Sequence, residues 1–228
     1  MNILAIETST KNFSLAVSKD GEILAARDIK LEGVLSSSII PSIDAILKKA
    51  KTSFQKIDGF AVGLGPGSFT SLRVGLSTMK GFCLASSKPI VGISSLDLIA
   101  MNAGEGKRDI CVLTDAKRDM VYAAIFTKSA AGLKRRSKYL LVQVKDLLPQ
   151  IKKETIFLGD GLSLYRPAIA SYCAKKSLKV IFADEKKWFP SASHLCLLAS
   201  KRFAAKKTDI CDKLVPIYLY PEDCQVHR

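Results

Sequence analysis

The stretch that decides the fold reads Gly63-Leu64-Gly65-Pro66-Gly67-Ser68-Phe69-Thr70-Ser71-Leu72-Arg73-Val74-Gly75. An apolar run over residues 57–64 leads into it, and a helical pattern over residues 71–86 follows. The order predicts a strand, a tight turn and a helix N-terminus. Glycines in such a turn either present backbone N–H groups to an anion or let two backbones pass close together. The missing Gly-Lys-Ser/Thr ending of a phosphate-binding loop favours the second role.

The chain before this turn has the pattern of three antiparallel strands, over residues 3–7, 13–18 and 22–29. Lys19-Asp20-Gly21-Glu22 predicts a hairpin turn between the second strand and the third. A helix is expected over residues 36–51, with Ser36, Ser37 and Ser38 as candidate N-caps. A strand over residues 89–93 and a short helix over residues 94–103 complete the first half.

The same order of elements restarts after the polar linker, residues 104–108. Strands are expected over residues 110–115, 121–127, 138–142, 155–158 and 179–183, and helices over residues 144–153, 162–176 and 191–207. Two similar β-β-β-α-β-α halves indicate an α/β fold with internal duplication. We expect an N-terminal subdomain over residues 1–103, a C-terminal subdomain over residues 104–220 and a tail over residues 221–228.

The composition is that of an ordinary globular protein, with 48% apolar and 25% charged residues among 228. No apolar run approaches the roughly 18 residues that a membrane span needs, and the N-terminus lacks a basic region, so we expect a cytoplasmic protein without membrane attachment. The six cysteines form no Cys-x-x-Cys pair and only two histidines are present, so the thiols are expected to be reduced and no metal site is expected.

The net charge of +14 belongs mostly to the second half of the chain. Residues 1–114 carry 13 basic and 10 acidic groups, whereas residues 115–228 carry 22 and 11. Lys134, Arg135 and Arg136 form the longest basic run. Such residues are either a solvated surface or a surface that attracts a polyanion such as RNA, and the sequence leaves both readings open.

Several motifs together resemble the TsaB (YeaZ) family, and the resemblance covers residues 2–220. They are the first strand with its Glu7-Thr8-Ser9 end, Gly65-Pro66-Gly67-Ser68-Phe69-Thr70, Leu72-Arg73, Gly92-Ile93-Ser94-Ser95-Leu96, Asp115-Ala116-Lys117-Arg118 before Val121-Tyr122, and Pro216-Ile217-Tyr218-Leu219. One departure concerns Ser71, because the family usually has glycine there.

The resemblance implies the actin-like ATPase (ASKHA, ribonuclease-H-like) fold and a role in making threonylcarbamoyladenosine in tRNA. It implies a non-catalytic subunit and not an enzyme. Such a subunit dimerises with the catalytic relative TsaD, which transfers the threonylcarbamoyl group to the adenosine next to the anticodon. The ATPase TsaE and tRNA would join through the complex, and a homodimer would form in isolation. No cofactor is expected for this chain, since ATP and magnesium belong to the complex.

The resemblance also suggests that the helices over residues 36–51 and 71–86 pack against the equivalent helices of TsaD or of a second copy. Small residues and surplus apolar coverage in both helices agree with a helix–helix contact. The residues expected in this interface are Ile40, Ile43, Leu47, Ser71, Leu72, Gly75, Leu76, Thr78, Met79 and Phe82. The basic run Lys134, Arg135 and Arg136 is a candidate tRNA contact.

A vestigial nucleotide site is the remaining candidate, at two turns where actin-fold enzymes bind phosphates. Its residues would be Glu7, Thr8, Gly65, Gly67, Gly159, Asp160 and Gly161. Turns that merely redirect the chain are the simpler interpretation of both loops, and Asp115 is expected at a hairpin tip. The alternative function for the whole chain is an actin-fold ATPase or small-molecule kinase with its own nucleotide turnover.

Overall fold

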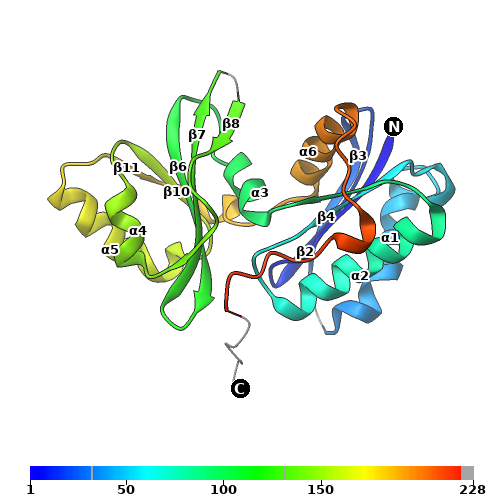
Figure 1. The fold of residues 1–228 in the computed structure, drawn as a ribbon, viewed down its shortest axis with the longest axis horizontal. Helices are drawn as coiled ribbons and strands as arrows, with labels where there is room; N and C mark the ends of the chain where they lie inside the picture. The colour runs from blue at the N-terminus through cyan, green and yellow to red at the C-terminus, as the bar shows by residue number, and fades with distance from the viewer. Residues whose placement is uncertain (32, 131, 222–228) are drawn as a thin grey trace. The chain divides into compact units, whose positions relative to one another are not determined.

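The computed structural model describes residues 1–31, 33–130 and 132–221, which form two compact units (Figure 1). The first unit contains Met1–Leu98 and Pro190–Ile217, and the second contains Ile99–Phe189 and the chain from Tyr218. Within these described ranges, no helix is long and apolar enough to cross a membrane. Cys224 and nearly all of the expected tail, from residue 222, lie outside the described residues.

The first unit is built on a five-stranded sheet with the order β3-β2-β1-β4-β5. Its strands are β1 (Asn2–Glu7), β2 (Asn12–Lys19), β3 (Glu22–Lys30), β4 (Gly59–Gly63) and β5 (Ile90–Ile93). The first three are antiparallel, whereas β4 pairs parallel with β1 and β5 parallel with β4. Asp20 and Gly21 have φ angles of 50° and 89°, which confirms the Asp-Gly turn between β2 and β3.

Helices cover both faces of this sheet because its central strands are apolar on both sides (Figure 1). On one face lie α1 (Leu35–Lys49) and α2 (Phe69–Ser86), whose Ile43 and Met79 join the cluster around Leu4 and Ile6. On the other face lies α6 (Ala192–Ala204), which packs against Ile3 and Ala5. The short α3 (Ser95–Met101) follows β5.

The start of α1 differs from the expected serine caps. Val34 occupies the N-cap position, and its carbonyl oxygen accepts hydrogen bonds from the hydroxyls of Ser37 and Ser38. The serines therefore lie inside the first turn, where their side chains satisfy a carbonyl oxygen instead of the free N–H groups.

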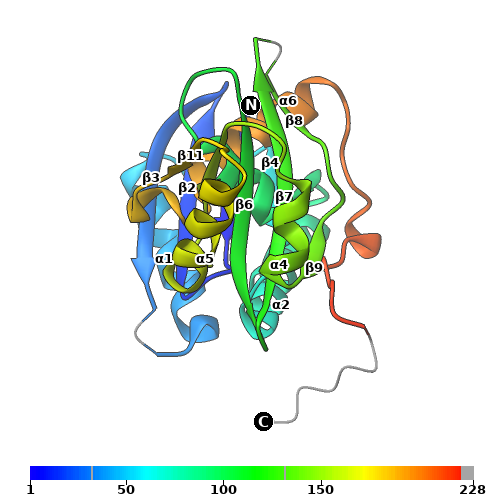
Figure 2. The same cartoon turned by 90° about the vertical axis from the view of Figure 1, so that its left-hand side faces the viewer.

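The second unit is built on a six-stranded sheet with the order β11-β10-β6-β7-β8, in which β9 also pairs with β7. Its strands are β6 (Arg108–Lys117), β7 (Met120–Ser129), β8 (Gly132–Arg135), β9 (Leu140–Val142), β10 (Thr155–Leu158) and β11 (Val180–Phe182). Figure 2 shows α4 (Val144–Leu147) and α5 (Leu162–Lys175) on one face, where they enclose a cluster that includes Trp188. Short 3₁₀ turns span Leu148–Gln150 and Glu185–Lys187 in this unit, and Phe54–Lys56 and Cys211–Lys213 in the first unit.

Two elements of the second unit differ from expectation. The helix expected over residues 144–153 ends after one turn, because Pro149 has no N–H to continue it and the chain tightens into a 3₁₀ turn. Strand β8 was not expected, since its Gly-Leu-Lys-Arg sequence lacks the apolar alternation of a half-buried strand. It is an edge strand, paired only with β7 among the described residues.

The two sheets repeat one topology, which confirms the internal duplication. Read from the same side, the first has the order β5-β4-β1-β2-β3 and the second β11-β10-β6-β7-β8. In both units a three-strand antiparallel part precedes a helix and a strand that returns parallel to the first strand. The ends of β1 and β6 are therefore equivalent positions, as are the turns after β4 and β10.

The boundary between the units differs from a single division after residue 103. The chain leaves the first unit after Leu98 and returns to it at Pro190. Leu195, Cys196 and Ala199 of α6 are fully buried against the first sheet. The physical reason is that β1 and β4 are apolar on the face opposite α1 and α2, and α6 supplies the cover.

Candidate functional site

The glycine-rich turn after β4 packs directly on the end of β1. A Cβ atom on Gly67 would lie 2.2 Å from the carbonyl oxygen of Ser9, and one on Gly75 would lie 2.4 Å from Oγ1 of Thr8. A Cβ on Gly63 would lie 1.9 Å from Oε2 of Glu7. These distances are shorter than real Cβ contacts, so the glycines allow close approach of two chain segments, which is the role that the sequence favours.

The polar groups of this turn find their partners inside the first unit. The N–H of Gly65 donates to Oγ of Ser95 at 3.1 Å, and the N–H of Ser68 donates to the carbonyl oxygen of Ser9 at 2.8 Å. The carbonyl oxygen of Gly65 accepts from the N–H of Ser95 at 2.8 Å and from the hydroxyl of Ser94 at 3.1 Å. The hydroxyl of Thr8 donates to the carbonyl oxygen of Ser71 at 2.9 Å.

Glu7 is the buried centre of this arrangement, with only 1% of its surface exposed. Its carboxylate accepts a hydrogen bond from the N–H of Ser9 at 2.6 Å and another from the hydroxyl of Ser95 at 2.8 Å. Burial raises the pKa of Glu7 above its ordinary value, and the hydrogen bonds from Ser9 and Ser95 oppose this rise. Glu7 therefore links the ends of β1, β4 and β5.

Substituting Glu7 with glutamine is expected to remove a loss of stability that develops as pH rises. Because burial raises the pKa of Glu7 above 4.5, the native chain keeps this proton to higher pH than the unfolded chain. The wild-type free energy of unfolding therefore falls as pH rises from about 4.5 through the native pKa. Glutamine does not ionise, so Glu7→Gln gains stability relative to wild type across that window. Urea denaturation of both proteins at several pH values measures the difference, and parallel pH profiles would contradict it.

The turn after β4 uses two of its N–H groups within its own unit, which leaves fewer for a nucleotide phosphate. A phosphate-binding loop needs unpaired N–H groups directed at the anion, but those of Gly65 and Ser68 are bonded to Ser95 and Ser9. A magnesium site needs a carboxylate with room for water, whereas Glu7 is fully buried against Gly63. Among the described residues, no three His, Cys, Asp or Glu side chains gather in a way that would hold a metal ion.

The equivalent turn of the second unit, Gly159-Asp160-Gly161, is also closed by its own chain. A Cβ on Gly159 would lie 2.0 Å from the carbonyl oxygen of Leu113, and the N–H of Gly161 donates to that oxygen at 3.2 Å. Oδ1 of Asp160 accepts from the N–H of Asp115 at 3.0 Å. Burial raises the pKa of Asp160. Both candidate phosphate turns thus pack on the neighbouring strand end.

Asp115 lies where β6 enters its hairpin to β7, as expected. Its carboxylate accepts from the N–H of Lys117 at 2.8 Å and pairs with the ammonium group of Lys117. Lys117, Arg118 and Asp119 have φ angles of 66°, 53° and 57°, so the tip is left-handed over three successive residues. The hydroxyl of Tyr220 donates to the carbonyl oxygen of Ala116 at 2.9 Å and so ties the end of the described chain to this hairpin.

Most of the residues expected in the partner interface belong to the core of the first unit. Ile43, Leu47, Leu72, Gly75, Leu76 and Met79 are buried there. The apolar row on α2 packs on the unit's own sheet, and a larger residue at Gly75 would collide with Thr8. Only Ile40, 50% exposed, and the half-buried Ser71, Thr78 and Phe82 are accessible. Six of the ten residues expected in the partner interface are therefore core residues of the first unit, and four remain accessible to a partner.

The exposed side of α2 carries other residues, and we call it the outer face of α2. It is formed by Thr70, Ser77, Gly81, Leu84 and Ala85, which helical spacing places on one side. Leu84 is 58% exposed, and a Cβ on Gly81 would meet nothing within 4 Å. The fold of the first unit therefore does not require glycine at position 81.

The basic run lies at the end of β8. Arg135 places its guanidinium 3.7 Å from the centre of the Tyr139 ring, and Arg136 forms an ion pair of 2.8 Å with Asp109. Lys134 is exposed. The three residues thus differ in their surroundings, although the sequence groups them as one contact.

Sequence reasoning missed the role of Ser95, which it names only within the motif Gly92-Ile93-Ser94-Ser95-Leu96. The signal available was Glu7: an acid at the end of an apolar strand needs buried hydrogen-bond donors, and serines after the adjacent parallel strand are suitable ones.

Comparison with known proteins gives three likenesses besides a family model. The model described as "TsaD: tRNA N6-adenosine threonylcarbamoyltransferase" matches residues 34–226. A tRNA threonylcarbamoyladenosine biosynthesis protein, TsaB of Escherichia coli, is 28% identical over 225 residues, which cover 96% of this chain and 94% of that protein. The solved structure of YeaZ from Pseudomonas aeruginosa superposes with a TM-score of 0.78 at 20% identity, over 95% of this chain and 100% of that one.

A more distant likeness concerns the fold alone. The activator of 2-hydroxyisocaproyl-CoA dehydratase from Clostridium difficile, solved with bound ADPNP, superposes with a TM-score of 0.51 at 11% identity. The superposition covers 92% of this chain and 99% of that one.

Proposed function

Because the chain belongs to the TsaB (YeaZ) family, within the wider family that the TsaD model describes, we propose that it is a non-catalytic subunit in tRNA threonylcarbamoyladenosine biosynthesis. It supports a TsaD-type transferase by dimerising with it. The ATPase TsaE and tRNA join through that complex. In the absence of TsaD, the same surface pairs two copies of this chain.

The chain has the actin-like ATPase fold, as the family resemblance implies. The observation that carries a non-catalytic role is the closed turn after β4. Its Gly65 and Ser68 N–H groups, the hydroxyl of Thr8 and both oxygens of Glu7 all have partners within the first unit. These contacts use two N–H groups of the turn and the carboxylate beside it, so fewer groups are left for a phosphate, which argues against the alternative of an ATPase or kinase with its own turnover.

The outer face of α2 supports a partner interface. Gly81 destabilises a helix by roughly 1 kcal/mol relative to alanine. No close contact within the first unit requires glycine there, because a Cβ would meet no atom within 4 Å. Small residues at Ser77, Gly81 and Ala85 leave room for a second helix to approach closely. Exposed Leu84 and Ile40 of α1 provide the apolar area that such a contact buries.

The test of the proposal is reconstitution. The chain is co-purified with its cognate TsaD, and threonylcarbamoyl transfer to tRNA is measured with TsaE, ATP and the threonylcarbamoyl adenylate supply, with and without this chain. We expect transfer to depend on the chain, and calorimetric titration of the isolated chain with Mg-ATP to give no heat of binding. Transfer at full rate without the chain, or ATP hydrolysis by the chain alone, would contradict the proposal.

A further inference from the structure

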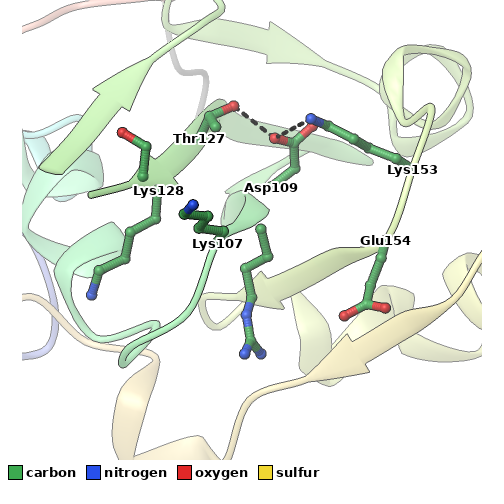
Figure 3. A pocket seen from close by; sticks show the side chains of 8 residues that line it. Lys107, Asp109, Thr127, Lys128, Lys153 and Glu154 are labelled. Carbon is green, nitrogen blue, oxygen red and sulfur yellow. Dashed lines mark hydrogen bonds and ion pairs between the residues drawn. The ribbon is translucent and has the colours of Figure 1, made fainter. Parts of the chain in front are cut away.

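A basic hollow lies at one edge of the second sheet, at the opposite end of β10 from the turn that follows this strand. It encloses about 400 Å³ where β6 begins and β7 ends. Figure 3 shows Lys107, Lys128 and Lys153 around it, with Asp109 and Thr127 between Lys153 and the sheet. Arg108, Ser129 and Glu154 complete its lining.

The buried acid of the hollow is already neutralised. Asp109 is only 4% exposed, and its Oδ1 accepts a hydrogen bond from the hydroxyl of Thr127 at 2.6 Å. The carboxylate also pairs with Arg136 at 2.8 Å and with Lys153 at 3.4 Å. Two cations therefore share the Asp109 carboxylate. Glu154, the other acid of the lining, forms no ion pair among the described residues, so four cations of the lining face two acids.

The remaining cations lack anionic partners. Among the described residues, Lys107, Arg108 and Lys128 form no ion pair, and the buried Nε of Arg108 has no hydrogen-bond partner. The Lys128 ammonium donates to the carbonyl oxygen of Gly104. Arg108 and Lys128 stand directly opposite each other in the β6–β7 ladder. Like charges in that position destabilise a sheet, so an external anion would relieve a repulsion that the fold itself leaves.

The positive charge continues beyond the hollow onto β8. Lys134 lies opposite Thr127 in the β7–β8 ladder, and the next residue, Arg135, stacks on Tyr139. The parallel strands β6 and β10 begin at this same edge, which brings Lys153 beside Arg108 and Asp109. We call the set Lys107, Arg108, Lys128, Lys134, Arg135 and Lys153 the basic edge.

We propose that the basic edge binds the phosphate backbone of an RNA, with Lys107, Arg108 and Lys128 contacting one phosphate in the hollow. The identity of the RNA as tRNA rests on the proposed function, whereas the phosphate site does not. Lys134 and Arg135 contact the next part of the strand, and Arg136 acts by holding Asp109. The proposal therefore keeps Lys134 and Arg135 of the candidate tRNA contact, replaces Arg136 as a direct contact, and adds the residues of the hollow.

The shape of the basic edge favours a polymer over a free nucleotide. Its cations line the hollow and continue along the β7–β8 ladder to Lys134 and Arg135, so they extend farther than a single phosphate reaches. The stacked Arg135–Tyr139 pair adds a planar surface of the type that nucleic-acid-binding proteins offer to bases. An acidic protein segment would need no such surface.

The test compares two double variants of the full chain in fluorescence anisotropy with a labelled, unmodified tRNA transcript. Lys107→Gln/Lys128→Gln removes two charges from the hollow. Lys175→Gln/Lys176→Gln removes two exposed charges at the end of α5 in the same unit and is the matched control. We expect the hollow variant to lose roughly tenfold in affinity and about 1.5 to 2 in the slope of log K against log salt. We expect the control to change affinity less than about twofold.

Equal losses in both double variants, or an unchanged salt slope in the hollow variant, would overturn the proposal. Polyglutamate that competes as well as unlabelled RNA at equal charge would reassign the site to an acidic protein, and inorganic phosphate that competes equally would reassign it to a free anion. The transfer assay separates this inference from the proposed function. Full transfer without the chain would refute only the subunit role, whereas intact RNA affinity in the hollow variant would refute only the phosphate site.

Discussion

Replacing Gly81 with arginine is expected to weaken association with the TsaD-type partner at least about 100-fold, or roughly 3 kcal/mol, while the monomer becomes slightly more stable. Gly81 lies on the outer face of α2, and a Cβ there meets nothing within 4 Å, so arginine fits the isolated chain. Arginine also favours a helix over glycine by roughly 0.5 to 1 kcal/mol. In a contact where helix axes lie about 8–10 Å apart, its long charged side chain prevents close packing.

The measurement is sedimentation of the chain alone and co-purification with TsaD, together with thermal unfolding. Ala174→Arg is the matched control, because it adds the same charge to an exposed position of another helix, α5. Gly75→Arg is the informative contrast. Since a Cβ at position 75 collides with Thr8, that variant is expected to unfold instead of remaining a folded monomer. Undiminished co-purification of Gly81→Arg would remove the outer face of α2 from the proposal.

Replacing Gly63 with alanine is expected to lower the free energy of unfolding by about 2 to 5 kcal/mol, or roughly 5 to 15 °C in melting temperature. The added methyl group would lie 1.9 Å from Oε2 and 2.5 Å from Cδ of Glu7. The buried carboxylate must then move and lose its hydrogen bonds from Ser9 and Ser95. Differential scanning calorimetry and urea denaturation measure the loss.

Two further variants show whether Glu7 is the cause. Gly81→Ala makes the same glycine-to-alanine change in open space and is expected to stabilise the chain slightly. Glu7→Ala/Gly63→Ala removes the colliding carboxylate, so its loss of stability should be smaller than the sum of the two single losses. Strict additivity would mean that the collision at Glu7 does not limit the native structure.

The sequence predicts the elements well where one local pattern controls them. The strand over residues 155–158 is found at those residues, and the helix expected over residues 162–176 ends one residue earlier. The Asp-Gly turn at residues 20–21 follows from the φ angles those residues tolerate. Pro149 shows the limit, since apolar spacing favours a longer helix there than the backbone of proline permits.

The residues expected in the partner interface show a different limit of the sequence. Helical periodicity identifies the buried side of α2, but it does not distinguish burial by the chain's own sheet from burial by a partner. Leu72, Leu76 and Met79 are buried by the first unit, and the exposed side is marked by a glycine that nothing in the unit requires. Only the surroundings of Gly75 and Gly81 separate these two glycines, and those surroundings come from distant parts of the chain.

For the glycine-rich turn, the local sequence itself indicates the role. The absence of a lysine and a following Ser/Thr from the turn was visible in the sequence, and it favoured a conformational role. The structure adds two partners, because Ser95 and Ser9 accept hydrogen bonds from the N–H groups of Gly65 and Ser68. Long-range pairing of this kind has no local pattern, and the same holds for the return of α6 to the first sheet.

That return has a consequence for biosynthesis. The first sheet is complete once the ribosome has passed Leu98, but α6 is made only after Pro190. At about 5–20 residues per second, the intervening stretch of roughly 90 residues takes about 5 to 20 seconds. During that interval Ile3, Ala5 and Val91 present an uncovered apolar face on the nascent chain. We therefore expect the early half of this protein to expose this apolar face until α6 emerges from the ribosome.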